Sequence, residues 1–314
     1  QRFGKNSMQA DFDGTPMPTD VMTDETLLAF ADVLGERGEG FIEILNAPSG
    51  TPGASNQGKD TGFVEEIARR SGAPVLYNAV MATDQPGLEK MHLRSMRWLD
   101  SCFERGLRIY GQGVTVRAPY QFTLEHWNMY DTSPAWNYAT LGSLEERLAK
   151  LSDPAVRERM KAEEDILVTV GVGGPIQGLV VQDTPGHPEL ARYHGRKLGA
   201  IAEAEGKHHI DVMLDIGVAG GLKVLYRTSE LASTDAKKIG ELVRNQHVMP
   251  GISDGGAHTK FFTGGSFPTD LIAWLARDEK QITLEQAHQR LSYLPAQAAG
   301  GGDFALLIDE LQIL

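Results

Sequence analysis

The sequence has only one cysteine among its 314 residues, so it cannot form an intrachain disulfide, and we expect it to work in a reducing compartment. It lacks any run of about 18 apolar residues, the length that a membrane-spanning helix needs. The first residues, QRFGKNSMQADF, contain no apolar core of the kind that secretory signals have. These absences predict a cytoplasmic protein with no membrane partner.

Positive charge is also scarce, with 30 Lys and Arg residues against 42 Asp and Glu residues and a formal net charge of −12. No basic cluster stands out from this balance, so we expect no nucleic-acid partner. Apolar residues make up 41% of the chain and charged residues 23%, which is enough apolar material for a large folded core. We therefore expect a globular protein, and its acidity points to no particular partner.

What the sequence does contain is a regular alternation of helix-like and strand-like segments. The amphipathic segments end at glycine, and a short apolar segment of strand length follows each of them. The repeat of roughly 30 residues is typical of parallel β/α units and predicts an α/β fold, either a barrel or an open sheet. The predicted helices are 24–38, 63–72 and 88–106, and the predicted strands are 41–46, 74–80 and 107–116.

An insertion at about 117–186 interrupts this alternation. It begins with a stretch rich in aromatic and turn residues, and we expect it beyond a strand end, where segments that shape a substrate site usually lie. Its predicted helices are 144–151 and 154–165, and its predicted strands are 166–173 and 179–182. The segments predicted after it are helical residues 187–217, a strand at 222–228, a helix at 232–246, a strand running into a turn at 247–258, and helices at 267–278 and 284–299.

The strongest candidate for chemistry is the segment Ser253-Asp254-Gly255-Gly256-Ala257-His258. It follows a predicted strand, and functional side chains gather at the carboxyl ends of parallel strands. A carboxylate there can act as a general base on water, and the glycines let the backbone approach a ligand. We therefore predict Asp254 as the catalytic residue and His258 as a pocket residue, with an ordinary Asp-Gly turn as the alternative.

Three residues around the predicted strand 107–116 are candidates for the same pocket. Arg117 comes just after this strand, where it can clamp a substrate carboxylate or form a surface ion pair. Tyr110 and Gln112 share one face of the strand because its side chains alternate with a period of two. They either line the pocket or are buried in the core.

Two other patterns carry weaker signals. Gly251, Ser253 and Gly255 match G-x-S-x-G, the nucleophile elbow of serine hydrolases, but the following residues do not have the pattern of the helix that this elbow requires. A serine hydrolase using Ser253 is thus a second alternative, for which Asp270 and His288 are the later acid and histidine.

A histidine pair also precedes two aspartates, in the order His208, His209, Asp211 and Asp215. Their spacing matches no common zinc motif, so we expect these four residues to be ordinary polar residues at a helix start.

Two long segments, GISDGGAHTKFF and SFPTDLIAWLARDEKQITLEQAHQRLSYLPAQAAG, resemble the end of the catalytic barrel in the amidohydrolase superfamily. The similar branch is that of D-aminoacylases, or N-acyl-D-amino-acid deacylases. PMPTDVMTDETLLAFADVLGERGEGFIEI resembles its fourth β/α step, and PVLYNAV and LRIYGQGVTV resemble the next two strands. The resemblance implies a TIM-type (β/α) barrel of the metal-dependent hydrolase kind. It implies one domain over residues 1–314, from about strand three or four to strand eight, incomplete at the N-terminus.

The resemblance also implies a function. It implies a hydrolase of carbon–nitrogen bonds other than peptide bonds, which deacylates an N-acyl amino acid or a related small amide. Asp254 is then the aspartate of the last strand, which takes the proton from the attacking water and is a candidate metal contact. Zinc is the implied cofactor.

The chain departs from the family at the expected metal ligands. The His-x-His pair of the family's first strand is absent from the sequence, and Asn78 and Gln112 stand where the family has histidines. Amides are weak zinc ligands beside histidine or cysteine. The alternative to an amidohydrolase is therefore a non-catalytic or truncated barrel fragment that binds a small molecule or a partner chain. Open strand edges in such a fragment predict a homo-oligomer or pairing with a separate N-terminal segment.

Overall fold

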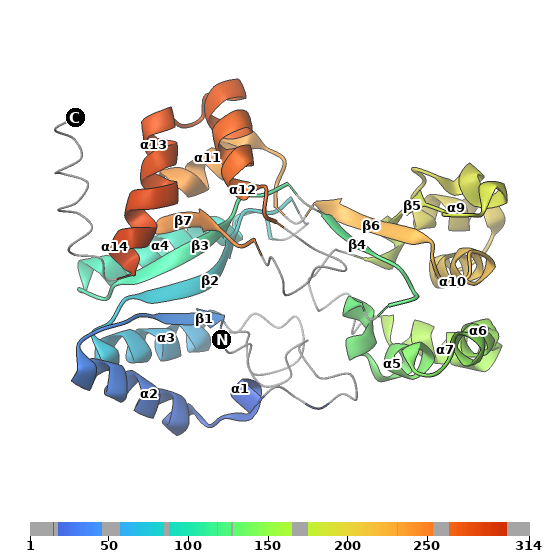
Figure 1. Cartoon of the computed structure of the whole chain (residues 1–314), viewed down its shortest axis with the longest axis horizontal. Helices are drawn as coiled ribbons and strands as arrows, with labels where there is room; N and C mark the ends of the chain where they lie inside the picture. The colour runs from blue at the N-terminus through green and yellow to red at the C-terminus, as the bar shows by residue number, and fades with distance from the viewer. Residues whose placement is uncertain are drawn as a thin grey trace.

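The computed structural model describes residues 15, 18–45, 57–84, 88–117, 119–126, 128–164, 175–230, 232–253 and 264–299. Four strands within these residues form a parallel sheet in the order β1-β2-β3-β7 (Figure 1). They are β1 (Ile42–Leu45), β2 (Val75–Met81), β3 (Ile109–Val114) and β7 (Val248–Gly251). All four coincide with predicted strands, and they confirm the expected α/β fold with parallel pairing.

Helices cover this sheet in the order that the sequence pattern predicts. They are α2 (Asp24–Arg37), α3 (Gln57–Ser71), α4 (Met91–Glu104) and α11 (Ala236–Arg244), after the short α1 (Pro18–Val21). Helix α2 begins at the cap residue Thr23, whose side chain accepts a hydrogen bond from the Thr26 amide, and ends at Gly38 with φ 70°. Helix α4 packs against β2 and β3, and α11 packs against β7.

Close packing between α4 and the sheet explains one glycine of β3. A Cβ atom on Gly111 would lie 2.6 Å from a methyl group of Val80 and 2.7 Å from one of Leu99. Since no side chain fits in that space, only glycine lets the helix approach the strand this closely.

Two further helical segments complete what we call the parallel-sheet region, which comprises the described residues 18–116 and 232–299. The first runs from α12 (Phe267–Thr269) into a π-helical stretch at Asp270–Asp278. The second consists of α13 (Leu284–His288), a π-helical stretch at Gln289–Tyr293 and α14 (Leu294–Ala298). Both confirm the helices predicted at 267–278 and 284–299.

Residues 119–230 form a separate unit, which we call the antiparallel region. Its strands β4 (Pro119–Phe122), β5 (Val180–Asp183) and β6 (Leu225–Glu230) pair antiparallel in the order β4-β6-β5. In Figure 1 they lead from the end of the parallel sheet to a group of helices on the other side of the molecule. The helices are α5 (Pro134–Thr140), α6 (Leu144–Ser152), α7 (Pro154–Ala162), α9 (Leu198–Glu205) and α10 (His209–Ala219), with 3₁₀ segments at Met129–Thr132, Ile176–Gly178 and Pro188–Tyr193.

The antiparallel region corrects two expectations. The predicted strand 222–228 forms as β6, but it pairs with β4 and β5 instead of joining the parallel sheet. The excursion also continues to Glu230, past the predicted end of the insertion at about residue 186. Strand β3 pairs directly with β7. Strand β6, which lies between them in the sequence, is therefore outside the parallel sheet.

A closed barrel is not present in the described part of the chain, where the parallel sheet has four strands. The predicted TIM-type barrel is therefore supported only as an α/β fold with a parallel sheet. Strand β1 lies at an edge of that sheet, so pairing of this edge with a second copy or an N-terminal segment stays a prediction. None of the described helices combines the length and the apolar character that crossing a membrane would require.

Candidate functional site

The second halves of β2 and β3 bring two predicted pocket residues next to each other. Asn78 of β2 and Gln112 of β3 are register partners, and Gln112 in turn pairs with Met249 of β7. Register partners on neighbouring strands lie about 4.8 Å apart and point to the same face. The structure therefore places these two amides side by side on the sheet.

Asn78 is buried and Gln112 is partly buried. Asn78 is only 8% exposed. The side-chain oxygen of Gln112 is buried and has no hydrogen-bond partner among the described residues. A buried polar atom left unpaired costs about 1–3 kcal/mol, so it marks a place where a further polar group belongs.

Tyr110 lies toward the start of β3 and belongs to the core. It is 5% exposed and packs with Met249, Leu294 and Ala298. The ring of Phe103 meets it edge-on at 5.0 Å between centroids. Of the two interpretations of Tyr110 that the sequence leaves open, the structure favours burial.

Arg117 follows β3 and is held by the helical segment that starts at Phe267. Its Nη2 donates to Asp270 Oδ1 at 3.2 Å, and its backbone N–H donates to Oδ2 at 3.3 Å. The guanidinium also lies 4.1 Å from the ring centre of Trp274. The ion-pair alternative for Arg117 is thus present, although 37% of the side chain remains exposed for a ligand.

A second ion pair near the carboxyl ends of the parallel strands, between Asp84 and Lys238, was not expected from the sequence. Asp84, which follows β2, accepts from Ser233 Oγ at 2.8 Å and from Lys238 Nζ at 2.6 Å. These bonds, the one from Lys238 above all, hold the pKa of Asp84 below its usual range. The pair ties the end of β2 to the start of α11, and no local signal could reveal it because about 150 residues separate its members.

The segment after β7 carries the main catalytic candidate. Ile252 has φ 69°, a left-handed conformation that is rare for a β-branched residue and that often marks functional segments. The carbonyl of Ser253 accepts from the Gly264 amide at 2.7 Å. Asp254 and His258 come next in the chain and lie outside the described residues, so their predicted roles stay predictions.

The serine-hydrolase alternative gains no support from the residues that the structure describes. Asp270 is engaged by Arg117 instead of a histidine. His288 lies exposed on α13.

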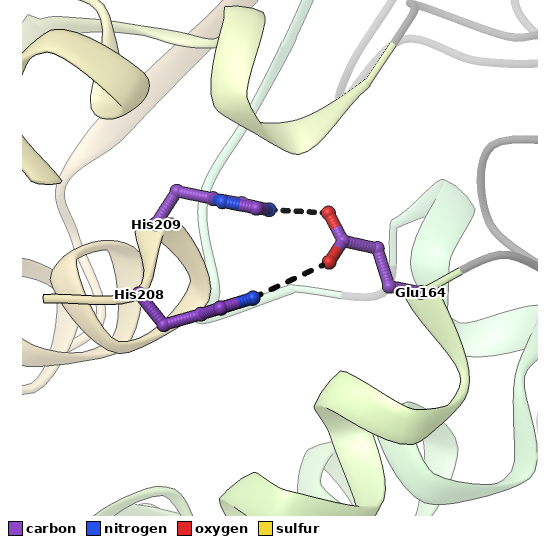
Figure 2. A group of neighbouring side chains, drawn as sticks. All are labelled: Glu164, His208 and His209. Carbon is purple, nitrogen blue, oxygen red and sulfur yellow. Dashed lines mark hydrogen bonds and ion pairs between the residues drawn. The ribbon is translucent and has the colours of Figure 1, made fainter. Parts of the chain in front are cut away.

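A group of possible metal ligands lies elsewhere, in the antiparallel region. Both histidines of the pair His208 and His209 turn toward the carboxylate of Glu164 (Figure 2). Asp211 and Asp215 do not join them, because they bind Lys161 at 2.6 Å and Arg157 at 2.6 Å respectively. The sequence interpretation of His208 and His209 as ordinary helix-start residues missed Glu164, whose only signal is proximity in space.

The described residues at the carboxyl ends of the parallel strands do not fit the zinc ion that the family resemblance implies. The described residues that end the four parallel strands or directly follow them include no histidine or cysteine. Asn78 and Gln112 offer neutral amides, and Asp84 is already bound by a lysine. Neutral amides are poor zinc ligands and Lys238 competes for Asp84, so no chemical step at these strand ends is assigned to a metal.

Comparison with known proteins gives partial matches. No family model matches the sequence. Uncharacterized proteins of Mycobacterium tuberculosis and Mycobacterium bovis are 30% identical over 103 residues, which is 31% of this chain and 17% of theirs. The chain thus spans a small part of these relatives.

Solved structures similar to this one are two deacylases. N-acyl-D-glutamate deacylase from Bordetella bronchiseptica, solved with zinc and a phosphonate inhibitor, has 18% identity and a TM-score of 0.46. D-aminoacylase, described as defining a subset of amidohydrolases, has 16% identity and a TM-score of 0.46. Each match covers 91% of this chain, which spans about half of the solved enzymes, at 48% and 47%.

Proposed function

We propose that this protein is a hydrolase of carbon–nitrogen bonds other than peptide bonds, acting on an N-acyl amino acid or a related amide. The observation that carries the proposal is that three chain segments meet toward the carboxyl ends of the parallel strands. The amides of Asn78 and Gln112 are register neighbours there, and the strand beside Gln112 leads through Ser253 directly to Asp254. These strand ends are where parallel α/β proteins place their active sites.

In the proposed reaction, a water molecule attacks the amide carbonyl carbon and Asp254 takes its proton. The tetrahedral intermediate then collapses, the carbon–nitrogen bond breaks, and Asp254 returns the proton to the leaving nitrogen. Amide N–H groups of Asn78 and Gln112 donate to the carbonyl oxygen as it gains negative charge, in the manner of an oxyanion hole. The products are a carboxylic acid and a free amine.

Two further residues contribute to substrate binding in this proposal. The exposed part of the Arg117 guanidinium offers donors to a substrate carboxylate beyond the one that binds Asp270. His258, four residues after Asp254, contributes a polar group to the same pocket.

Hydrolysis of a panel of N-acyl D- and L-amino acids, followed by mass spectrometry, tests the proposal. We expect turnover by the wild type and a fall of about 10²–10⁴-fold in kcat for Asp254→Asn, because this variant removes the general base. Asp278→Asn is the matched control, since this exposed carboxylate binds only Arg277 among the contacts described. Equal rates for Asp254→Asn and Asp278→Asn would refute the assignment.

The alternative is amide binding without catalysis, which the replacement of histidines by Asn78 and Gln112 favours. Equilibrium dialysis of the same panel separates the two functions. Saturable binding with no product over many hours indicates the binding protein, whereas product formation that needs Asp254 indicates the hydrolase.

A further inference from the structure

The cluster of Glu164, His208 and His209 belongs to the antiparallel region and plays no part in the proposed hydrolysis. Glu164 lies just past α7, His208 is the cap residue of α10, and His209 is its first helical residue. The Nε2 atom of His209 is hydrogen-bonded to one carboxylate oxygen of Glu164, and Nε2 of His208 lies 3.7 Å from the other. Figure 2 shows the two rings pointing at this single carboxylate from the same side.

The spacing of these three side chains suits a small cation after small side-chain rotations. One ligand atom from each residue lies within 4.8 Å of the other two, and the two rings are stacked with centroids 4.2 Å apart. Ligands about 2.0–2.1 Å from a tetrahedral zinc ion lie about 3.4 Å from one another. Side-chain rotations of about 1 Å are therefore sufficient, because the hydrogen-bonded atoms of His209 and Glu164 must move apart to admit the ion while the more distant ligand atoms approach.

The neighbouring charged side chains leave the carboxylate of Glu164 available to bind a metal ion. Lys161 is the nearby cation, and it is held by Asp211 at 2.6 Å and by Glu158 at 2.9 Å. Glu164 therefore faces the two imidazoles instead of a lysine.

The tautomer of His208 sets a small cost for binding. Its Nδ1 accepts from the Ile210 amide at 3.3 Å, so the neutral ring carries its proton on Nε2, facing Glu164. A metal ion at Nε2 replaces that proton, which moves to Nδ1 and ends this long cap bond. Two imidazoles and one carboxylate are a ligand set that zinc uses in proteins, and they compensate for one weak cap.

We propose that Glu164, His208 and His209 bind zinc or a similar divalent transition-metal ion, with water in the fourth position. The side chains of Glu164 and His209 are 19% and 16% exposed and that of His208 is 38% exposed, so the ion can enter from solvent. The bound ion ties the residue that follows α7 to the start of α10. This site does not depend on the proposed hydrolase.

Calorimetric titration of the chelator-treated full chain with zinc chloride tests the site. The comparison is best made in an Asp254→Asn background, which removes any metal contact of that residue. We expect one equivalent of zinc, and binding at least tenfold weaker, or lost, in His209→Gln and in Glu164→Gln. His187→Gln is the matched control, because His187 pairs with the single carboxylate of Glu189 at 3.0 Å and should leave binding unchanged.

X-ray absorption of the zinc-loaded Asp254→Asn chain provides a measurement that does not depend on how the ligand variants fold. We expect scattering from two imidazole rings. No zinc binding, undiminished binding by His209→Gln and Glu164→Gln, or zinc without imidazole scattering would each overturn the site. Loss of hydrolysis in Asp254→Asn with zinc binding retained would support both proposals separately.

Discussion

The parallel-sheet region and the antiparallel region have different kinds of core. Buried residues of the first are mostly aliphatic, such as Val75, Val80, Ile109 and Leu99, and they suit strands that helices cover closely. The second is also largely aliphatic but contains several buried rings, including Phe122, Trp136 and Tyr226. The comparison teaches that a repeating β/α unit needs small branched residues, whereas an irregular excursion is stabilised by a few large rings that fill uneven space.

The two regions also differ in how they hold a carboxylate that is partly or fully shielded from solvent. In the parallel-sheet region, Glu65 accepts from Arg105 at 2.7 and 2.9 Å and from Trp98 at 2.8 Å, so it stays ionised. In the antiparallel region, Asp131 accepts from the Asn128 amide at 2.8 Å and from the Thr140 hydroxyl, with no cation bound to it in the contacts described. Burial therefore dominates at Asp131, and an ion pair dominates at Glu65.

The largest expected effect comes from removing a ring of the second core. Trp136 is 2% exposed, its Nε1 donates to the Met160 carbonyl at 3.3 Å, and its ring lies 5.2 Å from that of Tyr130. We expect Trp136→Ala to lower the free energy of unfolding by about 3–5 kcal/mol. Hydrogen exchange should show lost protection in α5–α7 and little change in β2 and β3.

Leu99→Ala is the matched substitution in the first core, since Leu99 is 0% exposed. We expect a loss of about 2–5 kcal/mol, with reduced protection in α4 and the parallel strands. If both variants reduced protection equally across the whole chain, the two cores would be one cooperative unit and the comparison would fail.

A smaller effect is expected from pH, and it should have opposite signs in the two regions. Burial raises the pKa of Asp131 to about 6 from 3.8, so its contribution to stability is full below pH 4 and is lost as pH rises through about 6. The loss is on the order of 2–3 kcal/mol. Thermal melts between pH 4 and 7 should show a decline in the wild type that Asp131→Asn flattens.

Glu65 provides the opposite case. Arg105 holds its pKa below the usual 4.5, so its contribution is present above that pH and is lost as pH falls through the lowered value. Glu65→Gln should therefore reduce the acid sensitivity below pH 4.5 and leave the Asp131 decline unchanged. A matching pH response of the two variants would contradict the contrast between burial and ion pairing.

The smallest expected effect is a test of close packing in the parallel sheet. Gly111→Ala forces a methyl group against Val80 and Leu99, and we expect a loss of about 1–3 kcal/mol in urea unfolding. Gly62→Ala is the control, because Gly62 lies on α3 with no heavy atom within 4 Å of the added methyl. Alanine there should be neutral or stabilise by about 0.5–1 kcal/mol. If Gly111→Ala and the wild type unfolded at the same urea midpoint, α4 would be able to move away from the sheet.

The candidate site was predictable in part. The family resemblance named Asn78 and Gln112 separately, as residues of two successive strands, and the register of β2 and β3 shows that they are partners. Arg117 was expected to bind a substrate carboxylate or a partner in an ion pair, but its partner Asp270 lies 153 residues further along the chain. Asp84 was missed because its lysine and serine partners are equally distant in sequence.

By itself, the sequence determined the local elements, because the 3.6-residue and two-residue periods, the capping residues and the terminal glycines act over a few neighbours. It predicted the helices α2, α4 and α11 and the parallel strands with small errors at their ends. Only the tertiary structure decided that β6 pairs antiparallel, that Arg117 meets Asp270, and that Glu164 meets two histidines. Those contacts depend on which distant surfaces bury each other, and no short window of sequence contains both partners.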